Sequence, residues 1–150
     1  MALDSKNKKV IHAHLGQEHY TTTLTAGNHE LISDEPKHSG GQDKGPDPYD
    51  YLLMSLGSCT AMTVRMYADR KEWPLENVYV ELLHHKKHAD DCGNCEKSSS
   101  KIDHIEKEVI VEGPLSEEQV ERLLEISQKC PVHRTLLSDI KISSSIDHKK

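Results

Sequence analysis

The stretch DPYDYLLMSLGSCTAMTVRMYADRKEW, residues 47–73, decides the fold because it predicts one long helix at the centre of the molecule. Asp47 can cap this helix, Pro48 suits its first position, and Asp50 can complete a capping box. No charged residue occurs from Tyr51 to Val64 and no face is clearly polar, so we expect the helix to be buried nearly all round. The uncharged run is too short to span a bilayer.

The composition of the whole chain narrows the class of protein. Its 150 residues favour a single domain with a hydrophobic core, with flexible ends at residues 1–9 and 147–150. The net charge of -6 and the lack of a basic stripe argue against nucleic-acid binding. The N-terminus has no apolar run of the kind found in signal peptides. We therefore expect a cytoplasmic protein with no membrane partner, whose four cysteines serve chemistry or metal binding.

Short alternating segments on both sides of the helix predict strands. Before the helix, three strands with hairpin turns between them are expected at residues 10–15, 19–25 and 30–33, followed by a loop rich in Gly and Pro. After it, strands over 78–88 and 102–112 would pair through a long polar loop.

The C-terminal third predicts two further helices and a last strand. A capping box opens the first helix at Ser116, and its buried stripe would comprise Val120, Leu123, Leu124 and Ser127. A short helix is expected over 131–137. A last strand over 140–146 would have Ile140, Ile142 and Ile146 on one face.

The expected element order is βββ-α-ββ-αα-β, an α+β fold with antiparallel sheets packed on a buried central helix. One subunit of this size would struggle to cover a helix that is apolar all round. We therefore infer a homodimer in which the partner covers the exposed side. The alternative is that both sheets of one subunit wrap the helix.

Cys59 lies in the middle of the central helix. Ser55 and Thr63 stand four residues to either side and hence on its face. A buried thiol in apolar surroundings is inert, so reactivity would require a nearby cation or a helix terminus. Simple packing is the alternative, because free cysteines are often just buried.

Cys130 has the stronger local case for activation. Pro131 follows it at the first turn of a new helix, which makes Cys130 the expected cap residue, where free N–H groups favour a thiolate. His133 and Arg134 lie within one turn and could add positive charge. The alternative is a cysteine that happens to stand at a helix kink.

Cys92 and Cys95 form a C-x-x-C motif in the polar loop, with His84, His85 and His88 just upstream. Thiolates and imidazoles at this spacing can hold zinc, and the pair could also be a redox dithiol. One isolated C-x-x-C motif is weak evidence, and the alternative is that both cysteines stay reduced and have no function. No P-loop or dinucleotide-binding motif is present, and no cofactor is expected.

Two cysteine motifs together resemble a known family. GPDPYDYLLMSLGSCTAMTVRMYADRKEWPL, followed about sixty residues later by LLEISQKCPVHRTL, is similar to the OsmC/Ohr family of osmotically inducible and organic-hydroperoxide-resistance proteins. The resemblance runs from about His12 to Ile146 and is closest to the broad OsmC-like branch.

The resemblance implies an intertwined homodimer with active sites between the subunits. It also implies a thiol-dependent reduction of small organic hydroperoxides. Cys59 would be the peroxidatic cysteine, whose thiolate attacks the O–O bond to give a sulfenic acid. Cys130 would be the resolving cysteine, forming a disulfide that an external dithiol reduces.

The chain departs from the family pattern at the groups that activate the thiol. Family peroxidases use an N-terminal arginine, whereas this chain has no arginine before Arg65. Asp50 stands at the helix-start acidic position, but on a straight helix it lies about 13 Å and half a rotation from Cys59 and is expected to act mainly as a cap. Arg65, Arg134 or His133 could replace the cation. The competing hypothesis is a non-catalytic dimeric binding protein that keeps the fold.

Overall fold

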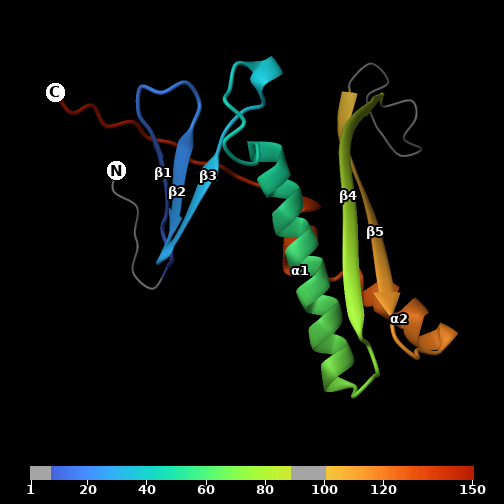
Figure 1. Cartoon of the computed structure of the whole chain (residues 1–150). Coiled ribbons are helices and arrows are strands. Elements are labelled where there is room, and N and C mark those ends of the chain that lie inside the picture. Colours follow the sequence, from blue (N-terminus) through green and yellow to red (C-terminus); the bar gives the residue numbers. More distant parts are fainter. Residues whose placement is uncertain (1–7, 89–100) are drawn as a thin grey trace. The chain divides into compact units, whose positions relative to one another are not determined.

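The computed structural model describes residues 8–88 and 101–150, and these divide into two compact units. One unit contains the described residues up to Leu52 together with Lys141–Lys150, and the other runs from Leu53 to Ile140. Among the described residues there are five strands, three α-helices and one 3-10 helix (Figure 1). The predicted α+β class with antiparallel sheets is confirmed.

The first unit contains an antiparallel sheet in the order β1-β2-β3. Its strands are β1 (Ile11–Leu15), β2 (Thr22–Ala26) and β3 (His29–Ser33). β2 and β3 join through the predicted tight turn, where Gly27 has a φ of 63° that suits glycine. β2 begins three residues later than predicted, because the connection from β1 is a longer loop than a two-residue turn.

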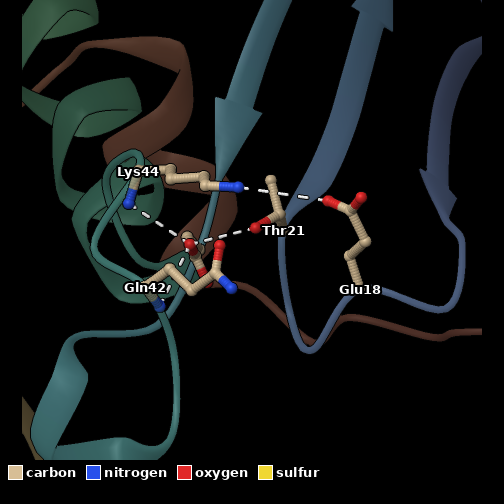
Figure 2. Close-up of polar contacts among 5 residues, drawn as sticks. Glu18, Thr21, Gln42 and Lys44 are labelled. Carbon is tan, nitrogen blue, oxygen red and sulfur yellow. Dashed lines mark hydrogen bonds and ion pairs between the residues drawn. The ribbon is translucent and has the colours of Figure 1, made fainter.

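A buried carboxylate organises the loop after β3. Asp34 is only 2% exposed. Its carboxylate accepts hydrogen bonds from Thr21 Oγ1 and from the backbone N–H groups of Gln42 and Lys44 (Figure 2). It also accepts one from the backbone N–H of Glu35. Burial alone would raise the pKa of Asp34, but these hydrogen bonds hold it below its ordinary value. The carboxylate thereby closes a segment that includes the 3-10 helix η1 (Lys37–Ser39).

The central helix α1 (Pro48–Arg70) begins where the sequence predicts. The Asp50 N–H donates to the Asp47 carboxylate at 2.9 Å, and the Asp47 N–H donates to the Asp50 carboxylate at 3.1 Å. This reciprocal pair is the predicted capping box, and it shows Asp50 acting as a cap.

In the single chain α1 is buried along one stripe only, and the all-round burial that we expect in a homodimer stays a prediction. Its buried residues Leu56, Gly57, Thr60, Val64 and Ala68 lie mainly along one stripe with a spacing of four residues. Met54, Met62 and Met66 are exposed and form a second stripe offset by two residues, which is roughly the opposite face. Apolar side chains on every face therefore did not mean burial on every face.

In the second unit, β4 (Asn77–His88) and β5 (Lys101–Glu112) form a long antiparallel ribbon (Figure 1). Leu82 of β4 pairs with Lys107 of β5. Gly57 of α1 approaches this point so closely that a Cβ added there would lie 2.8 Å from Leu82 Cδ1. The ribbon therefore brings Lys107 to the level of the helix turn that carries Cys59 and Thr60.

The core of this unit joins α1 to the ribbon and to helix α2 (Glu117–Ser127). Its central residues are Val64, Ala68, Leu75 and Leu123, and Tyr67, Trp73, Val78, Val111 and Leu115 pack against them. The Ser116 capping box of α2 is confirmed. The predicted stripe of α2 is partly wrong, because Ile126 is buried whereas Val120 and Leu124 are exposed. Helix α3 (Pro131–Leu136) follows after a short kink.

The predicted last strand is not formed. Residues 140–146 are all described and adopt no regular structure, and the Ile142 side chain is 85% exposed. A strand needs a neighbouring strand to satisfy its backbone groups, and alternation of apolar residues does not supply one. Within the described parts of the chain, no helix is both long and apolar enough to cross a membrane.

Candidate functional site

The two helical cysteines meet inside the second unit. Cys59 lies on α1 and is half-buried, whereas Cys130 precedes α3 and is 0% exposed. Both are free thiols, and Cys59 lies close enough to Cys130 to help lower the pKa of the Cys130 thiol. A dithiol pair is thus assembled from residues that stand far apart in the sequence.

The Cys130 sulfur caps α3, as the sequence predicts. It accepts a hydrogen bond from the backbone N–H of His133 at 3.3 Å. The Thr60 hydroxyl lies 3.5 Å from the same sulfur and is itself completely buried. Two donors within the protein therefore converge on a sulfur that water does not reach.

Lys107 is a site residue that the sequence interpretation missed. Its Nζ donates hydrogen bonds to the Ser127 carbonyl at 3.0 Å, to His133 Nδ1 at 3.0 Å and to the Thr60 hydroxyl at 3.3 Å. These three acceptors use all three ammonium protons. The ammonium is therefore held on the inner face of the ribbon beside the two thiols.

The surroundings of Cys130 favour its thiolate. Burial alone would raise the pKa of this thiol. Hydrogen bonds from Thr60, from the His133 N–H and from Cys59, together with the positive charge of Lys107, outweigh burial and lower the pKa of Cys130 below its ordinary value. The site therefore favours a negative charge on Cys130.

The surroundings disfavour the charged forms of Lys107 and His133, whereas they favour the charged form of Cys130. Burial lowers the pKa of Lys107, while the negative charges of Cys130 and Cys59 act to raise it. Burial and the Lys107 charge both lower the pKa of His133. Because His133 Nδ1 accepts a hydrogen bond from Lys107, the imidazole is neutral and carries its proton on Nε2.

The ends of two helices reinforce this arrangement. Ser127 is the last residue of α2, so its carbonyl belongs to the negative end of a helix that faces the Lys107 ammonium. Cys130 stands at the positive end of α3. The kink between α2 and α3 thus presents opposite partial charges to a lysine and to a thiolate.

The other predicted candidates lie away from the thiols or make other contacts. Arg65 donates to the backbone carbonyls of Leu75 at 2.7 Å and Glu76 at 2.8 Å, which ties α1 to the start of the ribbon. Asp50 caps the start of α1. Arg134 is on α3 with an exposed side chain.

The C-x-x-C pair, Cys92 and Cys95, lies outside the described residues. Within the residues that the structure describes, no group of three or more His, Cys, Asp or Glu side chains is arranged to hold a metal ion.

One sequence signal could have identified Lys107. In β5 the inner face is marked by Ile105, Val109 and Val111, and Lys107 falls in phase with them. A lysine on the buried face of a strand must find acceptors or a counter-charge. The sequence of β5 alone, however, does not show that the two thiols lie opposite this face of the strand.

Comparisons with known proteins agree with this fold. The family model for OsmC-like protein matches residues 41–145, a span that includes both helical cysteines. A search of curated proteins finds no match.

Solved structures resemble the chain over most of its length. An OsmC-like protein from Mycoplasma pneumoniae has 22% identity and a TM-score of 0.67, covering 90% of this chain and 89% of that chain. An organic hydroperoxide resistance protein OsmC from Legionella pneumophila has 17% identity and a TM-score of 0.62, covering 86% and 88%. An organic hydroperoxide resistance protein from Elizabethkingia anophelis has 14% identity and a TM-score of 0.62, covering 89% and 90%. At these identities the likeness shows a shared fold, and the family model supplies the relationship: the chain belongs to the OsmC-like protein family.

Proposed function

We propose that this protein is a thiol-dependent peroxidase that reduces organic hydroperoxides through Cys59 and Cys130. The observation that carries the proposal is the buried Cys130 sulfur near Cys59, which contacts the Thr60 hydroxyl and the His133 N–H beside the Lys107 ammonium. Family membership and the names of the Legionella and Elizabethkingia neighbours agree with this chemistry. Lys107 takes the place of the arginine that the chain lacks before Arg65.

The exposure of the two sulfurs supports the roles proposed for them. A hydroperoxide can approach Cys59, which is half-buried, but not Cys130, which is 0% exposed. Cys130, whose pKa is lowered, accepts the Cys59 proton as the Cys59 sulfur attacks the outer peroxide oxygen. The O–O bond breaks to give Cys59 sulfenic acid and an alkoxide, which takes that proton and leaves as the alcohol. Cys130 is again a thiolate.

The second half of the cycle closes the disulfide. The Cys130 thiolate attacks the Cys59 sulfur, an S–S bond forms and hydroxide leaves. An external dithiol then reduces the disulfide by thiol exchange. Cys130 has the activated thiol, yet Cys59 makes the attack. Both fit this order of steps, because the Cys130 thiolate first takes the Cys59 proton and later attacks the Cys59 sulfur.

A homodimer completes the proposal. The second stripe of α1, which contains Met54, Met62 and Met66, is apolar. Met62 and Met66 are 64% and 70% exposed in the single chain. Exposed apolar stripes of this kind are typical of protein–protein contacts. A second copy packed against α1 would cover this stripe and bring the partner close to the helix that carries Cys59.

The test compares two serine variants. Cys59→Ser should abolish turnover of an alkyl hydroperoxide with a dithiol reductant. Cys130→Ser should still be oxidised once at Cys59, but more slowly, because the thiolate that takes the Cys59 proton is gone. It should not form the intramolecular disulfide, and mass spectrometry should detect the trapped Cys59 sulfenic acid instead. Turnover by Cys59→Ser at the wild-type rate would contradict the proposal. A protein that forms no disulfide with peroxide, and whose thiols titrate like free cysteine, would instead be the non-catalytic binding protein.

A further inference from the structure

Lys107, the cation of this site, can give up its proton. The negative charge that favours its protonated form comes from the thiols. An arginine stays protonated under all ordinary conditions, whereas a buried lysine can become a neutral amine. Lys107 is partly buried, and the negative groups that favour its charge are the two thiols. The single negative charge of this pair is lost when a disulfide forms.

We propose that Lys107 is the proton donor linked to closure of the Cys59–Cys130 disulfide and remains a neutral amine in the oxidised protein. The inference deepens the proposed peroxidase cycle and rests on it. In the closing step the Cys130 lone pair forms the S–S bond and is oxidised, while the sulfenic sulfur of Cys59 is reduced as its S–O bond breaks. The hydroxide that leaves takes the Lys107 proton and becomes water. Charge is balanced, because thiolate and ammonium disappear together.

The Thr60 hydroxyl can accommodate both states of the lysine. In the reduced protein it accepts from Lys107 Nζ at 3.3 Å and can donate to the Cys130 sulfur at 3.5 Å. Once that sulfur is in a disulfide, the hydroxyl hydrogen can turn toward the lone pair of the neutral amine. The buried amine then remains fully hydrogen-bonded without any movement of the backbone.

His133 provides a route by which a proton returns to Lys107 when the disulfide is reduced. Its Nδ1 accepts from Lys107 at 3.0 Å, and the ring is half-buried at the start of α3. A proton received on one ring nitrogen can be matched by loss of a proton from the other. The Lys107–His133 contact therefore joins the interior of the ribbon to the edge of the helix.

Among the described residues, the groups around Lys107 include no other charge that would hold its proton. The facing titratable residues are Cys59 from α1, and Cys130 and His133 from the α2–α3 region. β4 places Leu82 opposite, and the neighbouring Glu106 and Glu108 on β5 alternate to the exposed face. Within the described part of the chain, no carboxylate lies within ion-pair distance of Lys107.

The experiment measures the equilibrium between the protein disulfide and a reference dithiol at several pH values near neutrality. All proteins carry Cys92→Ser and Cys95→Ser, so that only the helical cysteines exchange. In wild type, reduction consumes two protons, one on Cys59 and one on Lys107, and the reference dithiol releases two. The exchange constant should therefore not change with pH.

Lys107→Arg supplies the decisive comparison. The arginine keeps its charge in both states, so reduction consumes one proton and the exchange constant should rise tenfold per pH unit, or about 30 mV in the two-electron potential. Lys86→Arg, on the exposed face of β4, is the matched control and should behave as wild type. A tenfold rise per unit in wild type, or a flat profile in Lys107→Arg, would overturn the inference.

The outcome is separable from that of the proposed function. The disulfide for this measurement can be formed by exchange with an oxidised dithiol, without a hydroperoxide. A protein that shows the expected pH profiles but does not reduce hydroperoxides would disprove the peroxidase and leave the redox-linked lysine standing. A protein that reduces hydroperoxides, but whose wild type and Lys107→Arg variant have equal pH profiles, would support the peroxidase and disprove the redox-linked lysine.

Discussion

Thr60 carries a single hydroxyl that serves two charged partners, the Lys107 ammonium and the Cys130 sulfur. A hydrogen bond to a charged group contributes about 1.5–3 kcal/mol, more than one between neutral groups. The side chain is completely buried, so water cannot replace the hydroxyl if it is removed. Thr60 is therefore a positioning residue for the dithiol, although it never touches the substrate in the proposed cycle.

Thr60→Val should raise the pKa of Cys130 and lower kcat/KM for an alkyl hydroperoxide by about tenfold, because a donor to the thiolate worth about 1.5 kcal/mol is lost. The thiolate can be titrated by its ultraviolet absorbance and the rate measured in the same buffer. Thr60→Ser keeps the hydroxyl and is the matched control, with a profile close to wild type. A Thr60→Val protein that is folded and titrates like Thr60→Ser would show that the hydroxyl does not set the thiolate charge.

At the scale of residues, the sequence predicted the two thiols but not Lys107, whose positive charge favours the Cys130 thiolate. Cys130 was correctly placed as a helix cap because Pro131 and the following turn are a local pattern. Lys107 was missed because its neighbours in space come from α1, α2 and α3, which are remote in sequence. The strand periodicity located its side of the ribbon, but only the fold shows which helices pack there.

Among the elements, α3 depends most directly on the chemistry, since the sulfur of Cys130 is its cap. A thiolate is a stronger hydrogen-bond acceptor than a disulfide sulfur. Oxidation should therefore weaken the bond from the His133 N–H and loosen the first turn of the helix. Loss of a cap costs about 1 kcal/mol.

We expect the His133 amide to exchange its hydrogen about fivefold faster in the disulfide form than in the reduced form, which corresponds to that loss. The Gln119 amide is the internal control, because Ser116 Oγ caps it at 3.2 Å and takes no part in the redox cycle. Exchange can be followed residue by residue by nuclear magnetic resonance. Equal protection of His133 in both redox states would show that the sulfur cap is not needed.

The same scale shows where local patterns succeed and where they stop. The capping boxes at Asp47 and Ser116 were predicted and are present, because a cap is decided within four residues. The strand over 140–146 was predicted and is absent, since a strand also requires a partner. The single chain buries only one stripe of α1, because apolar composition does not state which neighbour covers each face of a helix.

For the whole molecule, the exposed stripe of α1 has a direct test. Met62→Glu together with Met66→Glu would place two carboxylates in the proposed subunit contact, where burial without a partner costs several kcal/mol. The variant should sediment as a monomer at concentrations where wild type is a dimer. Gln128→Glu adds a carboxylate at another exposed position and should leave the dimer intact. A wild-type protein that is monomeric throughout would disprove the proposed assembly.

The identity of the residues on that stripe has a consequence for a protein that handles oxidants. Leucine at these positions would be inert, but a hydroperoxide converts the methionine thioether to a polar sulfoxide. Met62 and Met66 are largely open in the single chain, on the same helix as the thiol that would meet the oxidant. In the proposed dimer each subunit would shield the other's thioethers, so that assembly protects the very surface that makes assembly possible. A subunit left alone in peroxide would lose its apolar stripe and, with it, the means to find a partner.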